Sequence, residues 1–440
     1  MYSNKNIWRI SYPIFLSLLA QNIINVTDTA FLGRVGETEL GASAMGGLYY
    51  ICVFTIAFGF SIGSQIVIGR RNGEKNYSAV GPVVVQGVIF LFSLATISFI
   101  GSKLFAGNVM RLLVSSDEIW NATMDFLDWR VVGFFFSFFN VMFRALYVGI
   151  TRTKVLTLNA IIMALTNVVL DYVLIFGHAG FPKLGMKGAA IASVIAEAVS
   201  VVFFVLYTYF TVDRKKCGLD KFRSFDFALL KQVLNISIFT MLQYFVSMST
   251  FFLFFIVVEK LGKQQLAVAN IVRSVYIVMF IPVNSLATAT NTIVSNLMGA
   301  GKVSSVIPAI RKISLISLGV MAIFSCVLAL FPQTILSIYT NDISLIQSSV
   351  QSLYIIAVAA LFSSAASVVF NGLSGTGNTR SALAIELGVL VIYTLFILMV
   401  GLVWRQPVHI CFMSEFVYFI LLLIGSMLYL RYASWQKKRI

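Results

Sequence analysis

Two aspartates lie inside long apolar stretches of the sequence and are its clearest candidates for chemistry. Asp28 falls late in an apolar run over 8–32, and Asp171 falls late in a run over 155–177. Asn167 precedes Asp171 by four residues and therefore shares its face of a helix. An ionisable group inside a membrane helix is costly and by default indicates a functional site. We therefore expect these side chains to form a binding site.

Ser193 adds a hydroxyl to this group. It lies early in the next apolar run, 184–212, whose helix returns across the membrane and brings Ser193 to the level of Asp171. Hard oxygen ligands suit a small cation, so Na⁺ held by Asp28, Asn167 and Asp171 is one interpretation. Proton binding by two desolvated carboxyl groups is the other. The structural alternative is that both aspartates only hydrogen-bond neighbouring helices.

A few further ionisable residues lie in apolar runs. Glu259 and Arg273 flank a short connection, and we expect a buried ion pair there with a structural or gating role. Arg273 is taken as the only basic residue well inside an apolar run. The remaining acids could equally cap or link helices; they are Glu197, Glu386 and Glu415.

The composition excludes a soluble globular protein. Of 440 residues, 59% are apolar and 11% are charged, against roughly 25% charged in a typical soluble domain. The net charge of +15 fits the excess of Lys and Arg in cytoplasmic loops of membrane proteins. A nucleic-acid partner is not expected, because no long polar basic segment exists. The four scattered cysteines have neither disulfide nor metal-ligand spacing.

Apolar runs of helix length predict an all-α membrane protein with twelve transmembrane helices, because a bilayer crossing needs about 20 apolar residues. Pro13 and Pro282 lie inside two of the runs and can kink their helices. No cleavable signal peptide is expected. The runs are 8–32, 44–69, 79–106, 122–149, 155–177, 184–212, 229–259, 266–294, 306–334, 347–374, 379–402 and 408–432.

The distribution of basic residues predicts the orientation. With the N-terminus inside, cytoplasmic ends and loops hold 22 of the 32 Lys and Arg residues, so both termini are expected in the cytoplasm. The most basic connection, 213–228, divides the chain into an N-terminal lobe, 1–212, and a C-terminal lobe, 229–440. We expect a multi-pass protein of a plasma membrane, such as a bacterial inner membrane.

The two halves resemble a parallel repeat with a constant offset of 224–226 residues. Gly149-Ile-Thr-Arg-Thr-Lys154, for example, corresponds to Gly375-Thr-Gly-Asn-Thr-Arg380. Six helices per half give both halves the same direction, as in some secondary transporters. The offset takes Asp28 to Phe252–Phe254 and Asp171 to Phe396–Ile397, so the acidic pair belongs to the first half alone.

One enzyme motif occurs by chance. Gly59-Phe-Ser-Ile-Gly63 matches a nucleophile elbow, but that motif needs a strand before it. Small residues at this spacing favour helix packing. With no Walker A or HExxH motif in the sequence, we expect neither an enzyme nor a cofactor.

The chain resembles the multidrug and toxic compound extrusion (MATE) transporters over nearly its full length. The resemblance is carried by residues of the first helix and by four later motifs: Pro13, Gln21 and Asp28 with Phe31, Gly33 and Gly36; Asn167-Val-Val-Leu-Asp171; Gly185-Met-Lys-Gly-Ala-Ala-Ile-Ala-Ser193; Pro282; and Gly299-Ala-Gly301-Lys302.

The resemblance implies two parallel six-helix lobes around a central cleft, and an antiporter that exports organic, cationic or amphipathic compounds in exchange for H⁺ or Na⁺. It implies that Asp28, Asn167 and Asp171 form the cation or proton site, with Ser193 where some members have Thr. Absence of an acid from the tenth helix points to the DinF-like branch.

We expect the partners to be small organic substrates and membrane lipids, and the functional unit to be a monomer. A flippase of lipid-linked glycans is the alternative function. The residues expected to line the substrate cavity or to gate it are Pro13, Gln21, Asn140, Glu259 and Arg273.

Overall fold

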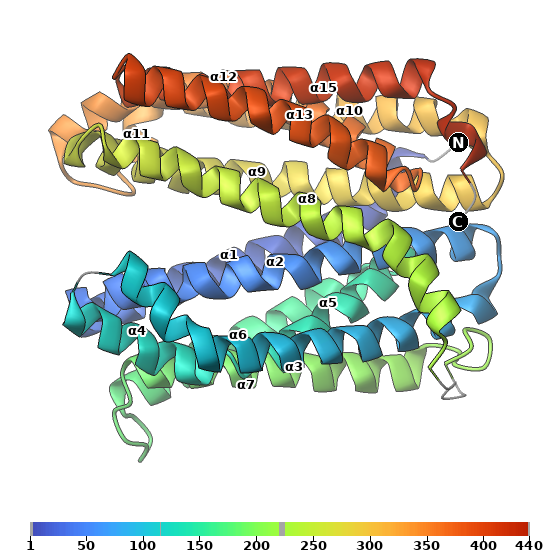
Figure 1. Ribbon diagram of the computed structural model, residues 1–440, viewed down its shortest axis with the longest axis horizontal. Coiled ribbons are helices and arrows are strands. Elements are labelled where there is room, and N and C mark those ends of the chain that lie inside the picture. The colour runs from blue at the N-terminus through green and yellow to red at the C-terminus, as the bar shows by residue number, and fades with distance from the viewer. Residues whose placement is uncertain (1–2, 115, 220–224, 439–440) are drawn as a thin grey trace. The chain divides into compact units, whose positions relative to one another are not determined.

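The computed structural model describes residues 3–114, 116–219 and 225–438, and within these ranges it is helical with no β-strand (Figure 1). Eleven helices are long and apolar enough to cross a membrane, or twelve when one bent pair is counted as a single span. Helices suit this environment because they satisfy every backbone polar group internally. The prediction of an all-α protein with twelve spans is confirmed.

The spans of the first half follow the predicted runs closely, with shorter connections than expected. Only Gly36 separates the first two helices. The helices are α1 (Asn4–Val35), α2 (Glu37–Gly73), α3 (Val80–Leu113), α4 (Asp117–Arg130), α5 (Gly133–Gly149), α6 (Lys154–Phe176) and α7 (Met186–Thr211), with a 3₁₀ turn η1 (Tyr77–Ala79) before α3.

The second half contains six further spans and several short elements. Gly262 joins its first two helices with a φ of 116°, which favours glycine because a side chain is strained there. The elements are α8 (Phe227–Glu259), α9 (Lys263–Gly299), η2 (Val303–Ser305), α10 (Val306–Leu330), α11 (Pro332–Leu336), α12 (Ile343–Gly375), α13 (Thr379–Leu398), a π-helical turn η3 (Met399–Val403), α14 (Val408–Cys411), α15 (Ser414–Tyr432) and η4 (Trp435–Lys437).

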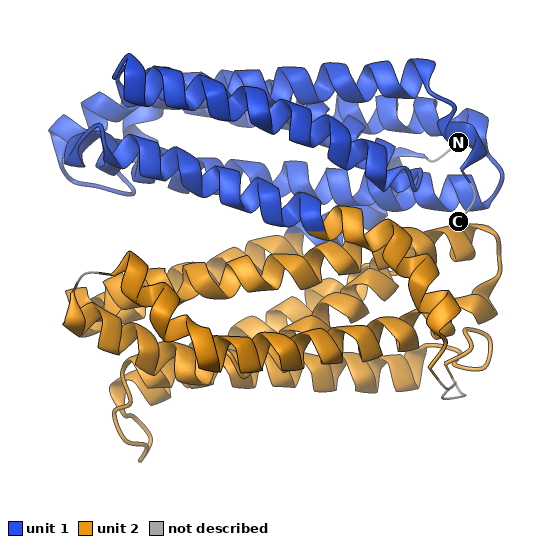
Figure 2. Cartoon of the chain, viewed as in Figure 1, with its two compact units in different colours: residues 1–15, 242–440 blue, residues 16–241 orange. Residues whose placement is uncertain are grey.

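The chain forms two compact units (Figure 2). Unit 2 comprises residues 16–241, and unit 1 comprises residues 1–15 and 242–440. Helices α1 and α8 each pass from one unit to the other, α1 after Phe15 and α8 after Met241. These two points lie 226 positions apart. The predicted linker, 213–228, lies wholly before the second point, and its residues 220–224 lie outside the described ranges.

Helix packing follows the same plan inside each unit. In unit 2, α2 packs against α3, α4 and α5, while α6 packs against α7. In unit 1, α9 packs against α10 and α12, while α13 packs against α15. A cluster of buried apolar side chains, including Val272, Met279 and Ile356, forms the core between α9 and α12.

The repeat is visible in the helix boundaries. Helix α9 begins and ends 226 positions after α2, and α10 begins 226 positions after α3. Helix α12 begins 226 positions after α4 and ends 226 positions after α5. A single helix in one half therefore corresponds to two helices, α4 and α5, in the other, and these meet at a bend of 54°.

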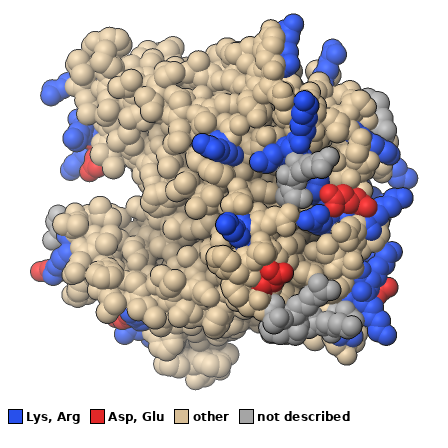
Figure 3. Space-filling model, turned by 45° about the vertical axis from the view of Figure 1, so that its right-hand side comes forward, with Lys and Arg blue, Asp and Glu red and all other residues tan. Residues whose placement is uncertain are grey.

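The surface agrees with a membrane environment. On the face shown in Figure 3, most of the surface carries neither basic nor acidic side chains, and the Lys and Arg residues are more numerous on its right-hand side. Exposed side chains on the long helices include Leu104, Leu165 and Leu315. Apolar side chains in such number on an outer surface are stable in lipid but not in water.

The glycines of the Gly59–Gly63 motif lie at a close helix contact. The Thr240 hydroxyl donates to the Gly59 carbonyl oxygen at 2.7 Å, and the Ser237 side chain lies against Gly63. A Cβ added at Gly59 would lie 2.7 Å from the Thr240 carbonyl oxygen. The motif is therefore a packing surface, as its spacing indicates.

Because of this contact, we expect two substitutions on α2 to change the stability of the protein differently. Gly59→Ala should lower the free energy of unfolding by about 1–3 kcal/mol, because the added methyl overpacks the contact. Gly47→Ala, where nothing lies within 4 Å of the new methyl, should be neutral or stabilising by up to about 1 kcal/mol. Thermal unfolding of the full chain in detergent measures both. Equal stabilities of the two variants would contradict the close contact.

Candidate functional site

The two aspartates and the asparagine predicted from the sequence meet within unit 2. Asp28 comes from α1, while Asn167 and Asp171 lie one turn apart on α6 and are buried. With its nitrogen facing the carboxyl groups, Asn167 donates to Asp28 Oδ1 at 2.9 Å and to Asp171 Oδ2 at 3.2 Å. One amide therefore bridges both acids and joins α1 to α6.

The carboxyl groups of Asp28 and Asp171 also lie within hydrogen-bonding distance of each other. Asp171 Oδ1 has no donor within the described part of the chain. Ionised carboxylates only accept hydrogen bonds, so a bond between two carboxyl groups requires a proton on one of them. The arrangement can therefore hold a proton between the acids, or a small cation in its place.

Ser193 lies at the edge of this group. Its Oγ is 3.5 Å from the end of the Asn167 amide that faces away from the carboxyl groups. Ser193 therefore contacts the bridging amide, and no contact with either carboxyl group is seen. Ser193 therefore lies near the two acids but is not among their nearest neighbours.

A small polar cavity of about 110 Å³ lies in unit 2. Asn140 donates to the Glu197 carbonyl oxygen at 3.1 Å, and Ser200 donates to the side-chain oxygens of Asn140 and Asn159. Gln21 and Asn140 both line this cavity. The main polar lining residues are Gln21, Asn140, Arg144, Asn159, Glu197 and Ser200.

This cavity shares helix faces with the acidic pair. Gln21 and Asp28 are separated by seven residues on α1, which is about two turns. Asn159 and Asn167 are separated by eight residues on α6, again about two turns and on one face. Each helix therefore carries polar side chains both at the cavity and at the carboxyl groups, about two turns apart.

A second charged group in unit 2 was not predicted. Arg130, the last residue of α4, contacts Glu197 on α7 through two bonds of 2.7 and 3.0 Å. Its guanidinium also lies 3.6 Å from the centre of the Tyr50 ring. The Tyr50 hydroxyl donates to Ser137 at 2.8 Å and lies 3.2 Å from Glu197. Arg130 lies in the last turn of α4, directly before the 54° bend.

The expectation that only Arg273 lies inside the apolar runs is therefore wrong. Arg130 lies within the predicted run 122–149 but is not among the charged candidates named from the sequence, and its side chain is only 13% exposed. A signal for this pair was present, because Glu197 lies in an apolar run and requires a cation or a proton. Distance along the sequence hides the partner, since the two residues are 67 positions apart.

The predicted ion pair between Glu259 and Arg273 is not found among the described residues. Glu259 ends α8 and is exposed, whereas Arg273 lies ten residues into α9, about 15 Å along the helix. The Arg273 guanidinium instead lies 5.0 Å from the centre of the Phe255 ring. Pro13 and Pro282 lie inside α1 and α9, as predicted.

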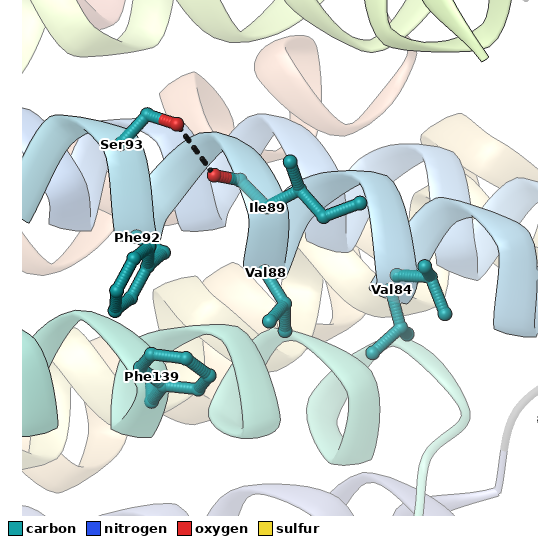
Figure 4. Close-up of a pocket in the computed structure, with 7 residues that line it drawn as sticks. Val84, Val88, Ile89, Phe92, Ser93 and Phe139 are labelled. Carbon is teal, nitrogen blue, oxygen red and sulfur yellow. Dashed lines mark hydrogen bonds between the residues drawn. The ribbon is translucent and has the colours of Figure 1, made fainter. Parts of the chain in front are cut away.

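Another hollow lies between α3 and α5 and has a different character (Figure 4). Its volume is about 290 Å³, and its lining includes Val84, Val88, Phe92 and Phe139. The single hydroxyl there, on Ser93, donates to the carbonyl oxygen of Ile89 in its own helix. This hollow offers no group that could bind an ion, so the acidic pair is the better candidate site.

The family model described as MatE matches residues 13–173 and again residues 240–400. The chain belongs to the MatE family. The two matches begin 227 positions apart, in agreement with the repeat in the helix boundaries. MatE proteins are membrane transporters and not enzymes, so the prediction of a non-enzymatic transporter is confirmed.

Curated relatives of this MatE protein match most of its length. A probable multidrug resistance protein NorM of Thermotoga maritima is 24% identical over 387 residues, which is 85% of this chain and 80% of the relative. A protein of the same name from Shewanella oneidensis is 22% identical over 394 residues, which is 88% of this chain and 84% of the relative.

Solved structures share the fold. The eukaryotic MATE transporter AtDTX14 has a TM-score of 0.88 at 16% identity, over 98% of this chain and 96% of that chain. A multidrug resistance MATE family transporter in its outward-facing conformation has a TM-score of 0.90 at 18% identity, over 99% and 97%. The two-lobed MATE fold is thereby confirmed.

The buried pair in this MatE transporter predicts a large stability effect. Glu197→Gln should lower the free energy of unfolding by about 3–5 kcal/mol, because it leaves the Arg130 guanidinium buried without its counter-charge. Lys103→Gln is the control. It breaks the pair between Lys103 and Asp128, whose side chains are 39% and 56% exposed, and should cost less than about 1 kcal/mol.

Thermal unfolding in detergent separates these outcomes. A double variant that replaces both Arg130 and Glu197 with Gln should recover part of the loss, because neither charge is then left alone. A Glu197→Gln protein as stable as the Lys103→Gln protein would contradict a buried, mutually dependent pair.

Proposed function

We propose that this MatE transporter is a secondary antiporter that exports organic, cationic or amphipathic compounds and takes up protons in exchange. The observation that carries this proposal is the pair of carboxyl groups, Asp28 and Asp171, which lie close together and are joined by the Asn167 amide. The names of the NorM relatives support multidrug substrates.

Proton coupling is favoured over Na⁺ coupling by the neighbours of the acids. The amide nitrogen of Asn167 is assigned to face both carboxyl groups, and in that orientation it holds the acids as a hydrogen-bond donor and not as a cation ligand. A proton shared between the two close carboxyl groups removes the repulsion between them.

Asp28 couples proton binding to movement because it lies on α1, a helix whose first part belongs to unit 1 and whose remainder belongs to unit 2. Loss of the shared proton leaves two carboxylates facing each other, and like charges at this distance repel. The contact between α1 and α6 is then weakened. Substrate and proton can in this way favour different states of alternating access, each by its differential affinity.

The DinF-like branch is favoured by the distribution of acids between the halves. Phe254 and Ile397 stand where the repeat would place counterparts of Asp28 and Asp171, so ion coupling belongs to the first half. We further propose a monomer in the plasma membrane with both termini cytoplasmic. The basic residues of the terminal and even-numbered connections support that orientation.

Replacement of Asp28 tests the proposal directly. Asp28→Asn keeps the size of the side chain and removes its titratable proton, so efflux driven by a proton gradient should fall to near background. Folding and substrate binding should persist, because the amide can still hydrogen-bond. The measurement is efflux of a fluorescent cation from proteoliposomes, with proton and sodium gradients imposed separately.

Asp125→Asn is the matched control, since Asp125 is an exposed acid of α4 whose only described partner is Lys187. It should transport as the wild type does. If a sodium gradient alone drives efflux by the wild type, the coupling ion is Na⁺ and not H⁺. Full proton-driven efflux by well-folded Asp28→Asn protein would overturn the mechanism.

The asymmetry of the halves gives a separate prediction. Asp171→Asn should impair ion coupling strongly, because a neutral amide cannot exchange a proton. Ile397→Leu changes the position that corresponds to Asp171 in the repeat, and it should leave coupling nearly intact. Efflux at several imposed pH gradients compares the two proteins. Equal defects would argue against a site confined to the first half.

A further inference from the structure

Unit 1 holds two carboxyl groups that take no part in the proposed mechanism. Glu386 on α13 is 3% exposed, and Glu415 begins α15 and is partly exposed. Glu386 Oε1 accepts hydrogen bonds from Tyr418, at 2.9 Å, and from Ser247. Glu386 Oε2 has no partner within the described residues. The Tyr276 hydroxyl donates to Glu415 Oε2 at 3.1 Å.

The repeat supplies an internal comparison for Glu415. Tyr276 stands 226 positions after Tyr50, and each tyrosine contacts a glutamate of the last span of its own half. In unit 2 that glutamate is Glu197, which is paired with Arg130. The position that corresponds to Arg130 in α12 is occupied by Ile356, a buried apolar residue. A similar tyrosine–glutamate contact therefore exists in unit 1 without a guanidinium, although Glu415 lies 218 positions after Glu197 and is thus not its counterpart in the repeat.

No other cation replaces the missing guanidinium. Within the described ranges, neither glutamate forms an ion pair with a Lys, Arg or His side chain. Helix α9 carries Arg273 one turn before Tyr276, but its guanidinium lies against the Phe255 ring. The polar side chains that lie near the two acids are uncharged: Ser247 on α8, Tyr276 on α9, Tyr393 on α13 and Tyr418 on α15.

A carboxylate buried without a counter-charge costs several kcal/mol or more, and a bound proton removes that cost. The hydroxyl donors around Glu386 suit the carbonyl oxygen of a neutral acid, while the unpartnered Oε2 leaves room for its proton. No group of three His, Cys, Asp or Glu side chains that could hold a metal occurs in the described chain.

We propose that Glu386 and Glu415 form a second proton-binding site, in the half of the protein that lacks counterparts of Asp28 and Asp171. Protons reach it through Glu415, which is the more exposed of the two. Tyr418 lies one turn beyond Glu415 on the same face of α15 and donates to Glu386. Tyr393 packs against Tyr418 with ring centres 6.1 Å apart.

The proposed site also contacts α8, the helix that passes from unit 2 to unit 1. Ser247 lies six residues beyond Met241, where α8 enters unit 1. Its hydroxyl forms a stronger hydrogen bond with an ionised Glu386 than with a neutral one. Proton binding at Glu386 therefore weakens the attachment of α8 to α13.

Infrared difference spectroscopy between acidic and alkaline pH tests proton binding itself, on the purified full-length protein. The wild type should show a carboxylic C=O band that disappears on deprotonation. Glu386→Gln and Glu415→Gln should each remove one component of that band. Tyr418→Phe should shift the Glu386 component to higher frequency, because the carbonyl loses one hydrogen-bond donor.

Two controls accompany these variants. Tyr432→Phe changes an exposed tyrosine of the same helix, 72% exposed, and Glu37→Gln changes an exposed acid at the start of α2. Both should leave the band unchanged. Spectra of Glu386→Gln and Tyr418→Phe that superimpose on the wild type would overturn the proposal.

The infrared band reports proton binding whether or not the protein transports substrate. Asp28→Asn should remove its own component of the band and leave those of Glu386 and Glu415 in place. A failure of proton-driven efflux would therefore reject the proposed function without affecting this site, and the absence of Glu386 and Glu415 components would reject this site alone.

Discussion

The cost of an uncompensated charge away from water governs the polar interior of this protein. Three groups of buried acids meet that constraint in three ways. Asp28 and Asp171 share an amide and lie within hydrogen-bonding distance of each other. Glu197 has a guanidinium, and Glu386 has two hydroxyl donors. A guanidinium pairs with the carboxylate form of an acid, whereas hydroxyl and amide donors are compatible with either protonation state. The first and third arrangements can therefore release and rebind a proton without leaving a buried cation alone.

The two halves share one backbone arrangement but carry different polar side chains. Helix boundaries coincide at an offset of 226 residues, because helix length is set by the membrane. The polar side chains do not coincide. Arg130 stands beside the bend between α4 and α5, whereas Ile356 stands inside the unbroken α12. The bend and the buried ion pair occur together in the half that also holds Asp28 and Asp171.

The spans and the acidic pair could be predicted from sequence because both follow from local rules. Apolar runs give helices of fixed rise, and two acids at equal depth on inward-facing positions must meet other polar groups. Arg130 could not be assigned by such rules, since its partner Glu197 lies on another helix and only packing brings them together. The expected contact between Glu259 and Arg273 failed for a related reason. Nearness in sequence across a tight connection was mistaken for nearness of side chains that lie about 15 Å apart along the helices.

Helices α1 and α8 connect these observations to movement. Each is a single helix that belongs to two units, and each changes unit at the same position of the repeat. Beyond that position each carries a side chain that bonds a neighbouring helix, Asp28 to α6 and Ser247 to α13. In both places the strength of the bond depends on a carboxyl proton, because ionised and neutral acids differ as hydrogen-bond partners. A proton gradient can therefore act on the two helices through the same physical interaction, even though the residues that supply it differ between the halves.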